Sequence, residues 1–158
     1  MFVYMMRHAD AEPAAPGQAD AGRRLTDKGL RRTRDTVKVL QRLGVELSLV
    51  LTSPLVRARQ TAEIVGAGLG TPVVEDERIG PGCHLESLAE AMEEHHVSGP
   101  VMFVGHEPDF SQLVGELIGR GRVEMRKGAI ACLSVQGLAP GAGVLVWLMP
   151  GKELAQLA

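Results

Sequence analysis

The sequence predicts an α/β fold built on a largely parallel sheet. Short apolar runs typical of strands alternate along the 158 residues with longer segments in which apolar residues recur at helical spacing. Three of the strand-like runs end at a short polar block that contains histidine, arginine or serine. In an open α/β sheet, ligands bind just beyond the carboxyl ends of the strands. We therefore expect one domain, residues 1–158, with a ligand site at that edge of its sheet.

The first expected elements follow from apolar spacing and from helix boundary signals. Residues 2–6 are expected to form the first strand. The stretch 9–21 is rich in Pro, Ala, Gly and Asp and has no apolar period, so we expect a loop over the site. Thr26 is expected to cap a helix that runs to about Leu43.

A second strand and helix follow in the same order. Residues 47–51 are expected to form the strand, and Ser53 and Pro54 are expected to be the cap and the first residue of the next helix. Residues 71–75 are expected to form a short third strand.

The second half of the chain repeats the alternation before it ends in a hairpin. Apolar residues from Leu85 to Met92 predict an amphipathic helix. Residues 101–104 predict a strand, and Pro108 is expected to open the helix that follows. Gly and Pro separate residues 129–135 from residues 144–149, which predicts an antiparallel hairpin at the sheet edge.

Composition excludes several classes of partner. The net charge of −2 gives no overall attraction to nucleic acid or to an anionic membrane, and aromatic residues are only 3%, too few for a base-stacking surface. No apolar run reaches membrane-spanning length, and the amino terminus does not resemble a signal peptide, so we expect a cytoplasmic protein. Cys83 and Cys132 match no metal or redox spacing, and we expect neither a metal nor a cofactor.

One local exception is a basic run near the amino terminus. It comprises Arg23, Arg24, Lys28, Arg31, Arg32 and Arg34. Two interpretations remain open at this point, a solvated helix face or a docking surface for an acidic partner.

The candidate site residues are Arg7, His8, Arg57 and His106. All of them fall at expected junctions between a strand and a helix, which structural demands alone do not require. Arginine matches the oxygens of a phosphate group, and histidine can act as a nucleophile or donate a hydrogen bond near neutral pH. This combination predicts phosphoryl chemistry with a phosphate or another anion bound in the site.

Three motifs resemble those of the histidine phosphatase superfamily, which includes the phosphoglycerate mutases. They are residues 6–9 (MRHA), residues 53–62 (SPLVRARQTA) and residues 104–108 (VGHEP). The short length and the Arg-His-Ala-Asp-Ala opening look most like the SixA-type phosphohistidine phosphatases. The resemblance implies a three-layer αβα fold with a largely parallel mixed sheet, like that of phosphoglycerate mutase.

The resemblance also implies roles for the matching residues. His8 would be the nucleophile that accepts the phosphoryl group. Arg7 and Arg57 would clamp the phosphoryl oxygens, and His106 would hydrogen-bond the same oxygens. We expect His8 to be neutral when it attacks and His106 to be most useful when protonated.

The general acid is not identified by the motifs. Asp10, Glu107 and Asp109 are close enough in sequence to be candidates, but a loop position favours a solvated carboxylate over an acid for each of them. The acid therefore stays unassigned.

The activity implied is hydrolysis of a protein phosphohistidine through a covalent intermediate on His8. The partner would be a phosphorylated protein, for example a phosphotransfer carrier. Two alternatives remain, a small-molecule phosphomonoesterase or mutase of the same superfamily and a catalytically silent phosphate-binding module.

Overall fold

The computed structural model describes residues 1–158 and contains one six-stranded sheet in the order β3-β2-β4-β1-β5-β6. Strands β3, β2, β4 and β1 run parallel, whereas β5 and β6 are antiparallel and form the hairpin expected at one edge. The strands are β1 (Phe2–Arg7), β2 (Leu49–Thr52), β3 (Val73–Glu75), β4 (Val101–Gly105), β5 (Ile130–Val135) and β6 (Gly143–Met149).

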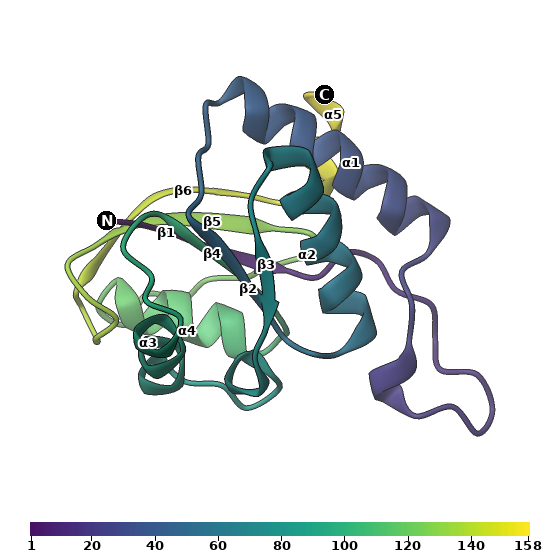
Figure 1. Cartoon of the computed structure of the whole chain (residues 1–158), viewed down its shortest axis with the longest axis horizontal. Helices are drawn as coiled ribbons and strands as arrows, with labels where there is room; N and C mark the ends of the chain where they lie inside the picture. The colour runs from purple at the N-terminus through teal and green to yellow at the C-terminus, as the bar shows by residue number, and fades with distance from the viewer.

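Helices cover both faces of the sheet, with α1, α2 and α5 on one face and α3 and α4 on the other (Figure 1). Side chains alternate along β1, so that Tyr4 and Met6 pack toward α1 and α2 and Val3 and Met5 pack toward α3 and α4. The expected three-layer αβα fold is confirmed. The helices are α1 (Asp27–Arg42), α2 (Val56–Leu69), α3 (Leu85–Glu94), α4 (Asp109–Leu117) and α5 (Gly151–Gln156), with 3-10 turns η1 (Asp20–Gly22) and η2 (Glu77–Ile79). None of the helices is both long and apolar enough to cross a membrane.

Strand register brings the three polar blocks to one place. Arg7 at the end of β1 is paired with Gly105 at the end of β4, and Thr52 at the end of β2 is paired with Val104. The residues that follow these strands therefore leave the sheet side by side at its carboxyl edge.

The loop after β1 is fixed against the start of α1. Thr26 caps α1 by accepting a hydrogen bond from the Gly29 amide at 2.9 Å, as predicted, and its own amide donates to the Asp10 carbonyl at 3.0 Å. A Cβ atom on Gly29 would lie 2.2 Å from the Asp10 carbonyl oxygen, so only glycine permits this approach. The packing of α1 therefore holds the segment that follows His8.

Three expectations about boundaries were wrong. Helix α2 begins at Val56 and not at Pro54, because Leu55 is still extended. The Ser53 hydroxyl accepts from the Leu55 amide at 3.2 Å and thus closes a turn before the helix. Strands β2 and β3 begin at Leu49 and Val73 and not at residues 47 and 71. Helix α5 was not expected, because six residues are too few to show a helical period.

Candidate active site

The four predicted residues meet at the carboxyl edge of the sheet. His8 directly follows β1, Arg57 lies in the first turn of α2, and His106 directly follows β4. The imidazole rings of His8 and His106 have centroids 5.3 Å apart, and Arg57 Nε lies 3.2 Å from His8 Nε2. His8 and Arg57 are 6% exposed and His106 is 4% exposed, so the cluster is almost enclosed.

The hydrogen bonds of His8 identify its tautomer. Its Nδ1 lies 2.7 Å from the Ala9 carbonyl oxygen, which can only accept, so Nδ1 carries the proton. In the neutral ring this leaves a lone pair on Nε2, and Arg57 Nε donates to that nitrogen. Nε2 is therefore the nucleophilic atom of the ring.

Burial keeps both histidines neutral in the free protein. Burial, reinforced by the charges of His106, Arg57 and Arg7, lowers the pKa of His8 to about 3. Burial and the charge of Arg57 lower the pKa of His106 to about 4. The lowered pKa of His8 agrees with the expectation that this residue attacks in its neutral form. His106 is also neutral in the free site, because burial and then the charge of Arg57 disfavour its protonated form.

Two buried nitrogen atoms of the cluster have no hydrogen-bond partner, and these are Arg7 Nε and His106 Nδ1. The other ring nitrogen of His106, Nε2, lies 2.7 Å from the Ser53 hydroxyl, so the residue expected only to cap a helix also orients an imidazole. Buried polar groups are almost always paired in folded proteins. The two unpaired nitrogens beside the neutral His8 therefore indicate a site in which a ligand supplies the missing hydrogen-bond partners.

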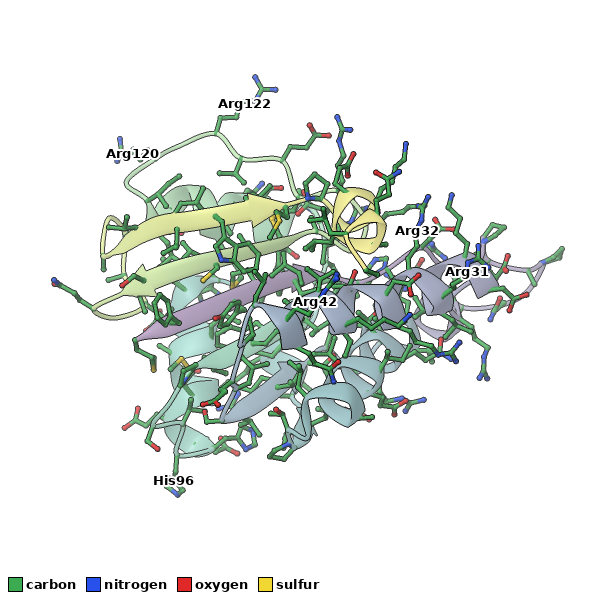
Figure 2. The ribbon with its side chains drawn as sticks, turned by 90° about the horizontal axis from the view of Figure 1, so that it is seen from above. Arg31, Arg32, Arg42, His96, Arg120 and Arg122 are labelled. Carbon is green, nitrogen blue, oxygen red and sulfur yellow. The ribbon has the colours of Figure 1, made fainter.

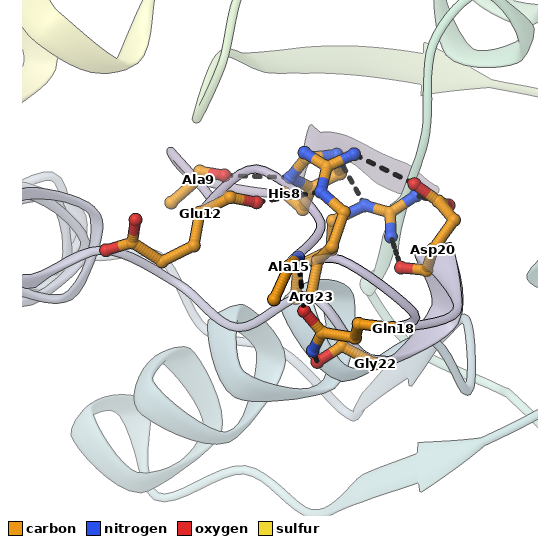
Figure 3. Close-up of polar contacts among 9 residues, drawn as sticks. His8, Ala9, Glu12, Ala15, Gln18, Asp20, Gly22 and Arg23 are labelled. Atoms are coloured by element: carbon orange, nitrogen blue, oxygen red, sulfur yellow. Dashed lines mark hydrogen bonds and ion pairs between the residues drawn. The ribbon is translucent and has the colours of Figure 1, made fainter.

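Arg57 donates hydrogen bonds to Asp20, a residue that was not among those predicted from the sequence (Asp20 is labelled in Figure 3). Its Nη1 and Nη2 donate to the backbone carbonyl and the side-chain Oδ2 of Asp20, each at 3.0 Å. The Asp20 side chain is 64% exposed and also pairs with Arg23 at 2.9 Å. Asp20 belongs to η1, in the loop expected to cover the site. Nothing local in the sequence distinguishes it from the other loop carboxylates, so only the folded loop reveals the contact.

The acid candidates named from the sequence have other partners. The carboxylate of Asp10 accepts from Lys127 at 2.7 Å and from the Thr26 hydroxyl at 3.0 Å. The carboxylate of Glu107 accepts from the amide and the hydroxyl of Ser111, and that of Asp109 accepts from the Gly82 amide. None of the three forms a hydrogen bond with His8, Arg57 or His106, so these carboxylates fix loops in this structure.

Close packing fixes the position of His106. A Cβ atom on Gly105 would lie 2.5 Å from the ring of Phe110, which is fully buried in α4. Because Gly105 carries no side chain, α4 packs directly beneath the end of β4 and His106 leaves the strand toward His8. No group of three or more His, Cys, Asp or Glu side chains is arranged to hold a metal ion.

Comparison with known proteins gives a consistent family. Residues 3–80 match the model of the histidine phosphatase superfamily, branch 1. The chain is 36% identical over 115 residues to an uncharacterized protein of Picosynechococcus sp., which covers 71% of this chain and 70% of the relative. It is 32% identical over 155 residues to the phosphohistidine phosphatase SixA of Escherichia coli, which covers 94% of this chain and 93% of the relative.

A solved structure agrees with these relatives. The structure of the protein histidine phosphatase SixA complexed with tungstate superposes with a TM-score of 0.84 at 31% identity, and the match covers 98% of this chain and 99% of the other.

Proposed function

The chain belongs to the histidine phosphatase superfamily, and we propose that it is a phosphohistidine phosphatase that uses His8 as its nucleophile. The observation that carries the proposal is a neutral His8 with its Nε2 lone pair exposed to the site, next to buried Arg7 and His106 nitrogens that have no hydrogen-bond partner. A phosphoryl group attached to Nε2 would supply oxygen acceptors for both nitrogens. The relatives named SixA support the substrate class, and the tungstate bound to one of them supports binding of an oxyanion by proteins of this kind.

The proposed reaction has two steps. In the first, His8 Nε2 forms a bond to phosphorus while the bond from phosphorus to the substrate imidazole breaks, and the protonated substrate ring leaves as neutral imidazole. In the second, water attacks the phosphorus of phosphorylated His8, the bond to Nε2 breaks, and inorganic phosphate and free His8 are released. Arg7 and Arg57 neutralise the oxygens in both transition states.

Arg57 has to change partners during this reaction. In the free protein its three nitrogens are used by His8 and Asp20. An incoming phosphoryl group would replace Asp20 on Arg57, and Asp20 is exposed enough to turn toward water. The negative charge of the phosphoryl group would also favour a proton on His106, which restores the role expected for that residue.

The proposed site also explains which leaving groups are favoured. Expulsion of a serine alkoxide needs a proton donor, and general acid catalysis is worth about 10²–10⁴-fold. A protonated phosphohistidine loses a neutral ring without such help. We therefore expect the preference for phosphohistidine to follow from the lack of a dedicated acid.

Turnover of three substrates tests the proposal. A phosphohistidine peptide and an activated aryl phosphate should be hydrolysed faster than a phosphoserine peptide, and enzyme quenched in denaturant should carry phosphate that is labile to acid and stable to base. Faster turnover of phosphoserine or of a sugar phosphate would favour the phosphomonoesterase alternative. Binding of phosphate without turnover would favour a silent module.

Chelators are expected to leave turnover unchanged. Arg7 and Arg57 provide the positive charge that a metal ion provides in other phosphatases. Loss of activity in chelator that is restored by a divalent ion would contradict the mechanism. The cytoplasmic location and the single-domain organisation stay predictions.

A further inference from the structure

Two adjoining hollows form one groove beside the proposed phosphoryl site. Their volumes are about 230 and 340 Å³, and they share Arg32 and Lys127. The first hollow is lined in part by Ala9, the residue after His8, and the second by Arg7. We call this surface the basic groove.

The basic groove carries an excess of positive charge in a chain whose net charge is −2. Three carboxylates line it, and two of them are already paired, Asp10 with Lys127 at 2.7 Å and Glu124 with Arg126 at 3.3 Å. Its cationic residues are Arg7, Lys28, Arg32, Arg126, Lys127 and Lys152.

Besides Arg7, which donates to a backbone carbonyl, three of these cations form no ion pair within the chain. Lys28 and Arg32 come from α1 and Lys152 from α5, and the only carboxylate left to oppose them in the groove is Glu153. Lys28 and Lys152 are exposed, and Arg32, labelled on α1 in Figure 2, is half-buried. The unpaired charge is therefore available to a partner.

Backbone contacts fix the groove relative to the nucleophile. Arg7 Nη1 donates to the Met125 carbonyl at 3.0 Å, and the Gly128 amide donates to the His8 carbonyl at 3.1 Å. The loop that carries Arg126 and Lys127 is thus attached on both sides to the Arg7–His8 segment. A partner held in the groove would be held at a defined position relative to His8.

The structure also separates the members of the basic run seen in the sequence. Only Lys28 and Arg32 of that run line the groove, whereas Arg23 is bound to Asp20 and to the Glu12 carbonyl. Lys127 and Lys152 join them from the other end of the chain. The two open interpretations of the run therefore apply to different residues.

We infer that the basic groove is the docking surface for an acidic segment of the phosphorylated protein substrate, an inference that rests on the proposed function. Carboxylates beside the phosphohistidine would lie against Lys28, Arg32 and Lys152 while the phosphoryl group reaches His8 past Arg7. Charges of one sign that line a cleft raise the association rate of an oppositely charged ligand by about 10–10³-fold, and salt weakens the effect. The groove selects the protein, and the phosphoryl site performs the chemistry.

Two peptides and a small substrate test this inference. Each peptide has a central phosphohistidine, flanked by glutamates in one and by lysines in the other, and the small substrate is p-nitrophenyl phosphate. With the unaltered protein at low salt, kcat/KM for the acidic peptide should exceed that for the lysine peptide by at least about 10-fold. The difference should lie mainly in KM and should shrink at high salt.

The informative variant is Lys28→Glu combined with Lys152→Glu. It should lose at least about 10-fold in kcat/KM on the acidic peptide, and it should gain on the lysine peptide, without a change on p-nitrophenyl phosphate. The matched control is Arg120→Glu combined with Arg122→Glu, which changes the net charge equally at exposed residues outside the groove (Figure 2). The control should keep the preference for the acidic peptide.

Several outcomes would overturn the inference. Equal kcat/KM for the two peptides with the unaltered protein is one, and an equal loss in the control variant is another. If the protein hydrolyses none of the three substrates, the proposed function fails. Calorimetric titration with the unphosphorylated glutamate peptide then still decides about the groove, which should bind it more tightly than the Lys28→Glu, Lys152→Glu variant does.

Discussion

Two clusters of histidine, arginine and aspartate lie at the carboxyl edge of the sheet, and they differ in how fully their hydrogen bonds are satisfied. One is the His8 cluster, which comprises the proposed catalytic residues and Asp20. The other follows β3 and consists of Asp76, Arg78, Glu94 and His95, and we call it the Asp76 cluster.

The Asp76 cluster is complete without a ligand. Asp76 Oδ1 accepts from the amide and from Nε of Arg78, and its Oδ2 accepts from Arg78 Nη2 and lies 2.9 Å from His95 Nε2. The remaining guanidinium nitrogen of Arg78, Nη1, pairs with Glu94 at 2.8 Å. The hydrogen bonds from Arg78 hold the pKa of the Asp76 carboxyl well below its usual range.

The His8 cluster, in contrast, is incomplete without a ligand. It keeps two buried nitrogens without partners, and its two histidines resist protonation. Since the residue types are alike, composition does not distinguish the clusters. The two buried nitrogens without partners distinguish them. A fully paired cluster stabilises a fold, whereas buried polar atoms without partners indicate a ligand.

The largest expected effect comes from replacing one histidine of each cluster, His8 and His95, in separate variants. His8→Ala should lower kcat by at least about 10⁴-fold, because the nucleophile is lost, while the circular dichroism spectrum and Tm stay close to those of the unaltered protein. His95→Ala, the matched change in the Asp76 cluster, should keep kcat within about threefold. Normal turnover by His8→Ala would remove the distinction between the two clusters.

Replacement of Arg57 should likewise lower kcat/KM more than replacement of Arg78. Arg57→Ala should cost about 2–4 kcal/mol of transition-state stabilisation, because one preorganised donor to the phosphoryl oxygens is lost. Arg78→Ala should leave kcat/KM nearly unchanged, since the ion pairs of its side chain are with Asp76 and Glu94 and not with the His8 cluster. The measurement is steady-state kinetics on p-nitrophenyl phosphate, and equal losses in both variants would contradict the comparison.

The free energy of unfolding should depend more on the Asp76 cluster than on the His8 cluster. Asp76→Asn should lower the free energy of unfolding by about 1–3 kcal/mol at pH 7, because it disrupts buried charged hydrogen bonds. The folded-state pKa of Asp76 is depressed, so its contribution is present above the unfolded value of about 4 and is lost as the pH falls further. Denaturant titrations between pH 7 and pH 3 should therefore show the variant and the unaltered protein converging in acid. A constant difference across that range would argue against the ionised carboxylate as the cause.

The smallest expected effect is that the His8 imidazole does not titrate near neutral pH. With the pKa of His8 lowered to about 3, its imidazole nitrogens should show no protonation step between pH 5 and pH 8 in ¹⁵N NMR spectra. The unfolded chain takes up this proton near pH 6.5, so the buried histidine makes the fold less stable as the pH falls from 7 toward 3. A His8 step near pH 6.5 would show that the ring is accessible to water and not enclosed.

The fold and the candidate residues could largely be predicted from local patterns. Apolar runs identified all six strands within about two residues of their observed ends, and Thr26 and Pro108 marked two helix starts as expected. The boundary at Ser53 was misplaced, because the same residue types cap helices and close turns. Helix α5 is too short to produce a period.

The contacts that define the site were not accessible in this way. The sequence by itself determined that Arg7, His8, Arg57 and His106 lie at junctions between a strand and a helix, since the order of apolar runs and polar blocks is a local property of the chain. The tertiary structure alone decided that Asp20 pairs with Arg57, that the Ala9 carbonyl sets the tautomer of His8, and that Lys28 and Lys152 line the same groove. These contacts depend on the strand order β3-β2-β4-β1 and on how α1 and α5 pack against the sheet. Packing joins residues far apart in the chain through the summed burial of many side chains, which no short window of sequence contains.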